Sequence, residues 1–125
     1  MLNHSETLEP KPVLDNALRD LRTAIGDYEV VKIDSTGLYC SVLNIWSDLA
    51  GNIEVYTKIE DAMAEKRRMM GQIAPIDLSM GDPVRQRYDP LNWVKNIPDD
   101  NSVHPGAFIL DRSKSLLSLL EGIQL

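Results

Sequence analysis

Few residues in this 125-residue chain could act as a nucleophile or as a general base. Cys40 is the single cysteine, and His4 and His104 are the two histidines. A catalytic thiolate needs an electropositive setting and a base that a third group orients. Cys40 instead lies within the apolar run LYCSVLNIW, so we expect a small buried side chain without a catalytic role.

The residues around Cys40 carry one resemblance to an enzyme family. Segment 34–41, DSTGLYCS, resembles the D-G-x-C-L stretch of ovarian-tumour-type deubiquitinases. The register differs, because the cysteine follows the Leu-Tyr pair, and Cys40 falls in a predicted strand rather than at a helix N-terminus. We therefore predict no catalytic residue here.

Metal and cofactor chemistry has little support in the sequence. Two distant histidines and one cysteine do not provide the ligands of a zinc site. Asp99, Asp100 and His104 are close in sequence, but Pro98 and the two aspartates that follow it are typical of a turn. No glycine-rich phosphate-binding loop is present. We expect no metal and no cofactor.

A long segment without regular periodicity, residues 80–106, is the strongest sign of function. It contains four of the seven prolines together with Tyr88 and Trp93. Loops longer than about 12–15 residues are usually functional or disordered, and disordered segments are poor in aromatic residues. The segment therefore predicts a contact surface, with Trp93 at least half buried against the domain or against a partner.

The charge is uneven along the chain, although the net charge is −6. Residues 1–65 carry 12 acidic and 5 basic side chains, whereas residues 66–125 carry 7 acidic and 8 basic ones. The basic half is explained by a solvated helix face with additional loop charges or, in a sharper hypothesis, by a small anion-binding patch on a partner-binding surface. The candidate residues of this surface are Arg85, Arg87, Tyr88, Trp93, Lys66, Arg67 and Arg68.

The overall composition bears on the class of partner and on the cellular compartment of the protein. An acidic chain does not favour nucleic acid or an anionic membrane, since both need an excess of Lys and Arg. No apolar run approaches the length of a membrane-spanning helix. With one cysteine and a polar N-terminus, the sequence predicts a cytoplasmic protein, of a cell or of an infected host.

Hydrophobic periodicity predicts an α+β fold with a small antiparallel sheet. The expected order is α-β-β-β-α-β-loop-β-α, with N- and C-terminal amphipathic helices covering the sheet. Residues 1–11 are expected to form an extended arm, and residues 12–125 a single domain. The predicted strands are Tyr28–Ile33, Leu38–Trp46, Ile53–Lys58, Gln72–Met80 and Ala107–Leu110.

Three helices are predicted from stripes of apolar residues. The first starts near Pro12 and ends at Gly26, and the second covers 59–70 with Thr57 and Glu60 as a capping box. Its methionines, Met63, Met69 and Met70, are expected to pack in the core. The third starts near Asp111 or Ser113 and continues to the chain end, with its leucines on one face.

These observations favour a non-catalytic protein-binding or assembly protein. It would be an adaptor, an inhibitor or a small subunit of a larger complex, and a virus-encoded protein fits equally well. The element order and acidity resemble the class I chaperones of bacterial type III secretion, which implies an acidic α+β dimer. Partners would be another protein or a second copy of the chain. A second hypothesis is a small enzyme with a site in the 80–106 loop, built from Asp82, Arg85, Tyr88 and His104.

Overall fold

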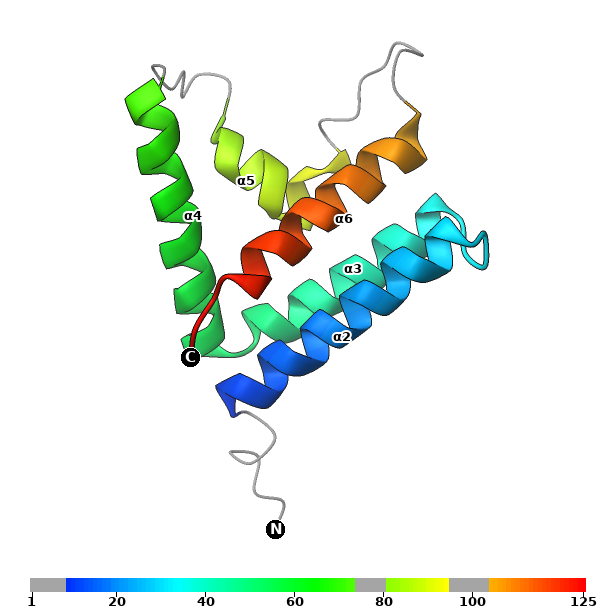
Figure 1. Cartoon of the computed structure of the whole chain (residues 1–125), viewed down its shortest axis with the longest axis horizontal. Helices are drawn as coiled ribbons and strands as arrows, with labels where there is room; N and C mark the ends of the chain where they lie inside the picture. Colours follow the sequence, from blue (N-terminus) through cyan, green and yellow to red (C-terminus); the bar gives the residue numbers. More distant parts are fainter. Residues whose placement is uncertain (1–8, 74–80, 95–103) are drawn as a thin grey trace.

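All regular secondary structure in the described part of the chain is helical, and no strand is present there. The computed structural model describes residues 9–73, 81–94 and 104–125 (Figure 1). The helices are α2 (Pro10–Glu29), α3 (Ser35–Ala50), α4 (Ile53–Ile73), α5 (Pro83–Tyr88), the 3-10 helix η2 (Pro90–Asn92) and α6 (Pro105–Glu121). The predicted α+β fold with an antiparallel sheet is therefore wrong.

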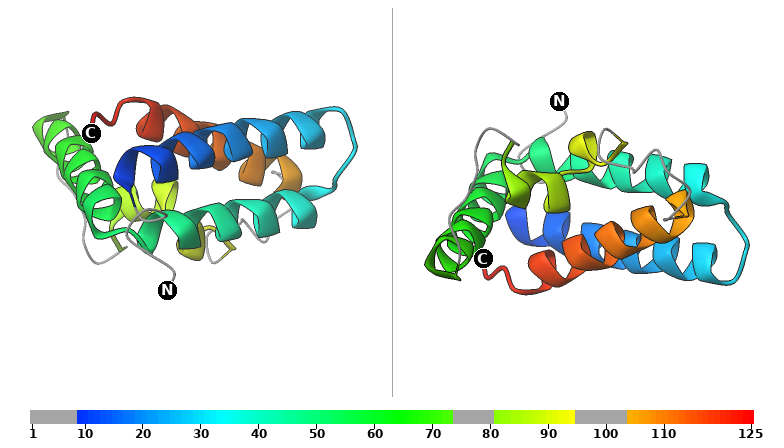
Figure 2. Two further views of the ribbon diagram at one scale, coloured as in Figure 1. Left: turned by 90° about the horizontal axis from the view of Figure 1, so that it is seen from below. Right: turned by 90° about the horizontal axis from the view of Figure 1, so that it is seen from above.

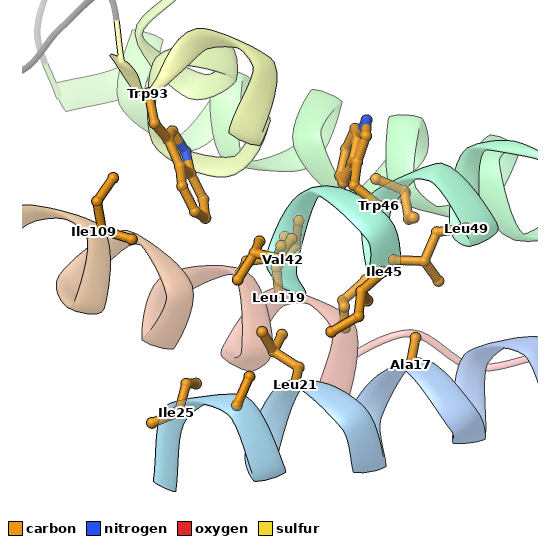
Figure 3. Close-up of a cluster of buried hydrophobic side chains, with 14 of the residues drawn as sticks. Ala17, Leu21, Ile25, Val42, Ile45, Trp46, Leu49, Trp93, Ile109 and Leu119 are labelled. Atoms are coloured by element: carbon orange, nitrogen blue, oxygen red, sulfur yellow. The ribbon is translucent and has the colours of Figure 1, made fainter. Parts of the chain in front are cut away.

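Helices α2, α3 and α6 form the main body. Helices α2 and α3 lie side by side as an antiparallel hairpin, and α6 packs against both (Figures 1 and 2). Side chains from all three helices meet in one apolar core, part of which is shown in Figure 3. Leu21, Leu38, Val42, Leu116 and Leu120 are completely buried there.

Helix α4 stands at one end of this body, and its C-terminal half extends beyond the other long helices (Figure 1). Its N-terminal half enters the core through Val55, Ile59 and Met63, which are fully buried. Helix α5 bridges the two parts, since it packs on both α4 and α6.

Helix α3 replaces the predicted strand Leu38–Trp46. The nearly continuous apolar run suggested a strand covered on both faces, but Leu38, Val42, Ile45 and Leu49 recur at helical spacing. All four are buried between α2, α4 and α6. The helix starts after Asp34, whose carboxylate accepts a hydrogen bond from the Gly37 N–H at 2.8 Å.

The predicted strand Ile53–Lys58 forms the first turns of α4. Its alternating β-branched residues indicated a strand. The buried face of α4 is instead marked by Val55, Ile59 and Met63, which are spaced four residues apart. The N-terminal cap is Asn52, whose side-chain oxygen accepts from the Val55 N–H at 3.1 Å. The predicted capping box at Thr57 and Glu60 lies inside the helix and is wrong.

The first predicted helix is confirmed, but its ends differ. Helix α2 begins at Pro10 and continues through Gly26 to Glu29. The predicted strand Tyr28–Ile33 is instead the end of α2 and the turn that leads into α3. Residues 1–8 of the predicted arm lie outside the described residues.

The C-terminal helix is confirmed, but it starts earlier than predicted and ends at Glu121 rather than at the chain end. Helix α6 begins at Pro105, and the Nδ1 atom of His104 accepts from the Gly106 N–H at 3.0 Å. The apolar run Ala107–Leu110, predicted as a strand, therefore belongs to α6, which ends at Glu121.

The 80–106 segment is partly regular, since it contains α5, η2 and the start of α6. Residues 95–103 lie outside the described residues. Of the predicted strand Gln72–Met80, residues 72 and 73 belong to α4 and the rest is not described. The resemblance to type III secretion chaperones depended on an α+β order of elements, which the structure contradicts.

Candidate functional site

Trp93 is part of the core rather than an exposed contact residue. Its side chain is 0% exposed, and its indole Nε1 donates to the Arg87 carbonyl at 2.9 Å. The ring of Tyr39 lies beside it, with 6.3 Å between ring centroids, and the Tyr39 hydroxyl donates to the Pro90 carbonyl at 2.7 Å. The expected burial of Trp93 is confirmed, and the indole anchors the α5–η2 segment to α3.

Two of the predicted partner-binding arginines are used within the chain. Arg67 on α4 pairs with Asp82 through its Nη2 atom at 2.6 Å and its Nε atom at 2.8 Å. Arg85 on α5 donates to the carboxylate of Glu60 on α4. Burial alone would lower the pKa of Arg85, but the hydrogen bonds that Arg85 donates to Glu60 and Tyr56 raise its pKa above the ordinary value. Both arginines therefore hold α5 against α4.

The other basic residues of α4 face solvent near its free end. Lys66 is exposed, and Arg68 is exposed and pairs with Glu65 one turn earlier. Met69 and Met70 are also exposed, at 50% and 39%, so the expectation that they pack in the core is wrong.

The residues of the enzyme hypothesis have structural partners. The Asp82 carboxylate accepts from the Val84 N–H at 3.0 Å and caps α5, in addition to binding Arg67. His104 caps α6, and Tyr88 packs against the core. Cys40 is exposed on α3, so the expectation of a buried thiol is wrong.

Arg87 belongs to a different cluster, at the contact between α5 and α6. Its Nη1 atom donates to the Ser115 hydroxyl at 3.0 Å and lies 3.5 Å from an Asp111 carboxylate oxygen. The Nη1 atom of Arg112 donates to the same oxygen at 2.8 Å. We call Arg87, Asp111, Arg112 and Ser115 the arginine cluster. Sequence reasoning selected Arg87 but missed the three residues of α6, because the folded chain brings α5 onto this helix.

A polar groove lies between α2 and α3 on the main body. Two adjoining cavities of about 320 and 350 Å³ share Asp20, Ile45 and Asp48 as lining residues, so they form one continuous groove. We call it the acidic groove. Its remaining acidic residue, Asp27, lies toward the turn between the helices.

The groove combines an apolar floor with acidic walls. Ala17, Ala24 and Ile45 are buried and form its floor. Among the described residues, the one ion-pair partner of Asp20 is its exposed neighbour Arg19, at 3.2 Å. In residues 9–73, 81–94 and 104–125, no lysine or arginine pairs with Asp27 or Asp48. Asp27 and Asp48 therefore present negative charge that no ion pair within the described residues compensates.

Sequence reasoning did not single out the residues that line this groove. The signal was the stripe Ala17, Asp20, Ala24 and Asp27, at spacings of three and four residues. Small residues on such a stripe allow a second helix to approach closely and leave a shallow channel over the contact. The aspartates of the stripe become significant only once α3 adds Asp48 from the other side.

Comparison of the sequence and structure with protein families, with curated proteins and with solved structures gave no match. Within the described ranges, no helix is long and apolar enough to cross a membrane. In the same part of the chain, no three His, Cys, Asp or Glu side chains are grouped closely enough to hold a metal ion.

Proposed function

We propose that this chain is a non-catalytic protein-binding domain that holds a basic amphipathic helix of another protein in the acidic groove. The single observation that carries the proposal is the pairing of an apolar floor with three aspartates on both walls. Recognition of an amphipathic helix by a groove places apolar side chains on the floor and polar ones at the rim.

The charge of the groove selects a basic partner. Lys and Arg side chains can lay their aliphatic stems along Ala17, Ala24 and Ile45 and bring their charged ends to the aspartates. Asp27 and Asp48 have no cation to displace within the described part of the chain, so binding breaks no existing ion pair there. An acidic segment would meet like charges and be repelled.

The small free energy of each exposed charge pair favours a fast and salt-sensitive interaction rather than a permanent one. Each exposed charge pair contributes about 0.2–1 kcal/mol, and the Debye length is only about 8 Å at physiological ionic strength. The aspartates would therefore act mainly on the association rate and on the choice of partner. The apolar floor would contribute the remaining affinity.

The proposal can be tested by NMR titration of the full chain with a synthetic helical peptide. The peptide carries leucines on one face and lysines on the other. We expect amide shifts concentrated at Asp20, Asp27, Ile45 and Asp48, and a Kd that rises with added salt. The double variant Asp20→Asn/Asp48→Asn should weaken binding about three- to tenfold.

The matched control is Asp15→Asn, which removes an exposed carboxylate of the same helix. Asp15 pairs with Lys11 and does not line the groove. We expect the control to change Kd by less than about twofold, because surface charges outside the contact are screened. Equal effects of the two variants, or shifts centred on α4 and α5, would contradict the proposed site.

A further inference from the structure

The arginine cluster contains more positive than negative charge. Arg87 and Arg112 converge on one oxygen of Asp111, at 3.5 and 2.8 Å. The remaining member, Ser115, is neutral and accepts from Arg87 at 3.0 Å. Among the described residues, one carboxylate therefore pairs with two guanidinium groups, and the cluster has a net charge of one positive unit.

Arg112 is held in place before any ligand arrives. Its guanidinium carbon lies 4.5 Å from the centre of the Phe108 ring, one turn earlier on α6. Its side chain is only 21% exposed, in contrast to 61% for Asp111. A fixed guanidinium loses less conformational entropy when it binds an anion than a mobile one does.

The hydrogen-bonding capacity of Arg112 is incompletely used. Its Nε atom is buried and has no hydrogen-bond partner among the described residues. Partial burial, followed by the nearby charge of Arg87, lowers the pKa of Arg112 below its ordinary value. A second negative charge near this pair would relieve the repulsion and give the guanidinium groups further acceptors.

We propose that Arg87, Arg112 and Ser115 form a binding site for a phosphate monoester, with the phosphate group taking the place of the Asp111 carboxylate. Asp111 is exposed and can turn into solvent. A dianion matches two guanidinium charges, whereas a single carboxylate does not. Arginine forks bind phosphate oxygens in pairs, and the Ser115 hydroxyl adds a donor. The acidic groove uses residues of α2 and α3, so this site does not depend on the proposed function.

The test uses isothermal titration of the full chain with O-phosphoserine, with serine and inorganic phosphate as comparison ligands. Asp111→Asn removes the competing carboxylate and should strengthen phosphoserine binding about tenfold. Arg87→Gln and Arg112→Lys should weaken it by a similar factor, the latter because lysine keeps the charge but lacks the fork. A purely structural cluster predicts no gain of binding in Asp111→Asn.

A matched control comes from another ion pair on the same helix. Arg22 of α2 pairs with Glu121 of α6 at 2.9 Å, and in the part of the chain that the structure describes no second arginine pairs with Glu121. Glu121→Gln therefore releases a single guanidinium. We expect Glu121→Gln to leave phosphoserine binding unchanged. An equal gain in both variants would overturn the proposal, as would binding of serine as tight as that of phosphoserine. Inorganic phosphate that binds more tightly than phosphoserine would show a free-phosphate site and overturn the monoester assignment.

Discussion

Val31, in the turn between α2 and α3, has a backbone conformation that suits its side chain poorly. Its φ is +62°, in the left-handed region, and 87% of its surface is exposed. That region costs an L-residue about 1–2 kcal/mol, and a β-branched side chain is especially unfavourable there. Val31→Gly should therefore increase the free energy of unfolding by about 1 kcal/mol.

The neighbouring valine provides the control for this prediction. Val30 is also exposed but has a φ of −97°, which any residue adopts. Val30→Gly should lower stability slightly, because glycine adds flexibility to the unfolded chain without relieving strain. Urea unfolding of both variants measures the difference. Equal effects of the two substitutions on the free energy of unfolding would mean that position 31 does not keep its left-handed conformation in solution.

Gly106 is required by the approach of Tyr28 rather than by its backbone conformation. A Cβ atom at position 106 would lie 2.0 Å from the Tyr28 hydroxyl oxygen and 3.0 Å from the His104 Nδ1 atom. Gly106→Ala should therefore destabilise the fold by about 1–3 kcal/mol, although alanine favours helices.

The double variant Gly106→Ala/Tyr28→Phe separates the clash from other effects. Phenylalanine lacks the hydroxyl, so most of the lost stability should return in the double variant. Thermal or urea unfolding of the two single variants and the double variant gives the coupling. If the changes in the free energy of unfolding of the two single variants simply add in the double variant, the Tyr28 hydroxyl is not what excludes a Cβ atom at position 106.

At the scale of elements, Asp82 joins α5 to α4 and also caps α5. Burial alone would raise the pKa of Asp82, but the hydrogen bonds from Arg67 and the Val84 N–H together lower it below the ordinary value. The unfolded chain therefore binds a proton at a higher pH than the folded chain does. The ionised Asp82 carboxylate therefore stabilises the folded state at neutral pH. This stabilisation decreases as the pH falls through the pKa that Asp82 has in the folded state.

We expect Asp82→Asn to cost about 1 kcal/mol or more at pH 7, since it weakens both the cap and the ion pair. The difference in the free energy of unfolding between Asp82→Asn and the wild type should shrink as the pH is lowered from about 6 to about 2. Urea midpoints across this range measure it. Asp61→Asn is the control, because it removes an exposed carboxylate of α4.

The sequence allowed α2, α6 and the 59–70 part of α4 to be predicted as helices, but not α3 or the first turns of α4. Helices α2 and α6 each carry a polar face, so their apolar stripes were visible. Helix α3 is packed by three other helices and is apolar on several faces, which hides its period. In α4, tertiary burial of Val55 and Ile59 overrode the strand propensity of the residues around them.

The candidate sites were less predictable than the helices, for a related reason. Both the acidic groove and the arginine cluster take residues from two helices, and their pairing depends on the fold. Asp20 and Asp48 are 28 positions apart, and Arg87 and Arg112 are 25 apart. The one member recognised from sequence, Arg87, was selected for its charge and for its place near Trp93.

For the whole molecule, helix α6 connects the separate parts of the core. It packs against α2, α3, α4 and α5, and Leu116, Leu119 and Leu120 are buried there. Burial of each such side chain contributes about 1.5–3 kcal/mol, whereas small domains are stable by only about 5–15 kcal/mol in total. A chain that ends at Lys114 should therefore unfold or aggregate, which circular dichroism and light scattering would detect.

Helix α6 could also form a contact with a second copy of the chain. The dependence of Tm on protein concentration distinguishes this role from packing within one chain. If α6 packs only within one chain, the Tm of the full protein is independent of concentration. If its exposed side also joins two copies, the Tm rises with concentration, because association stabilises the folded state by mass action. We expect no concentration dependence, since the leucines at the centre of α6 are already buried within the chain. A rising Tm would contradict this expectation, and a soluble, equally heat-stable truncated chain would show that α6 supports neither core nor interface.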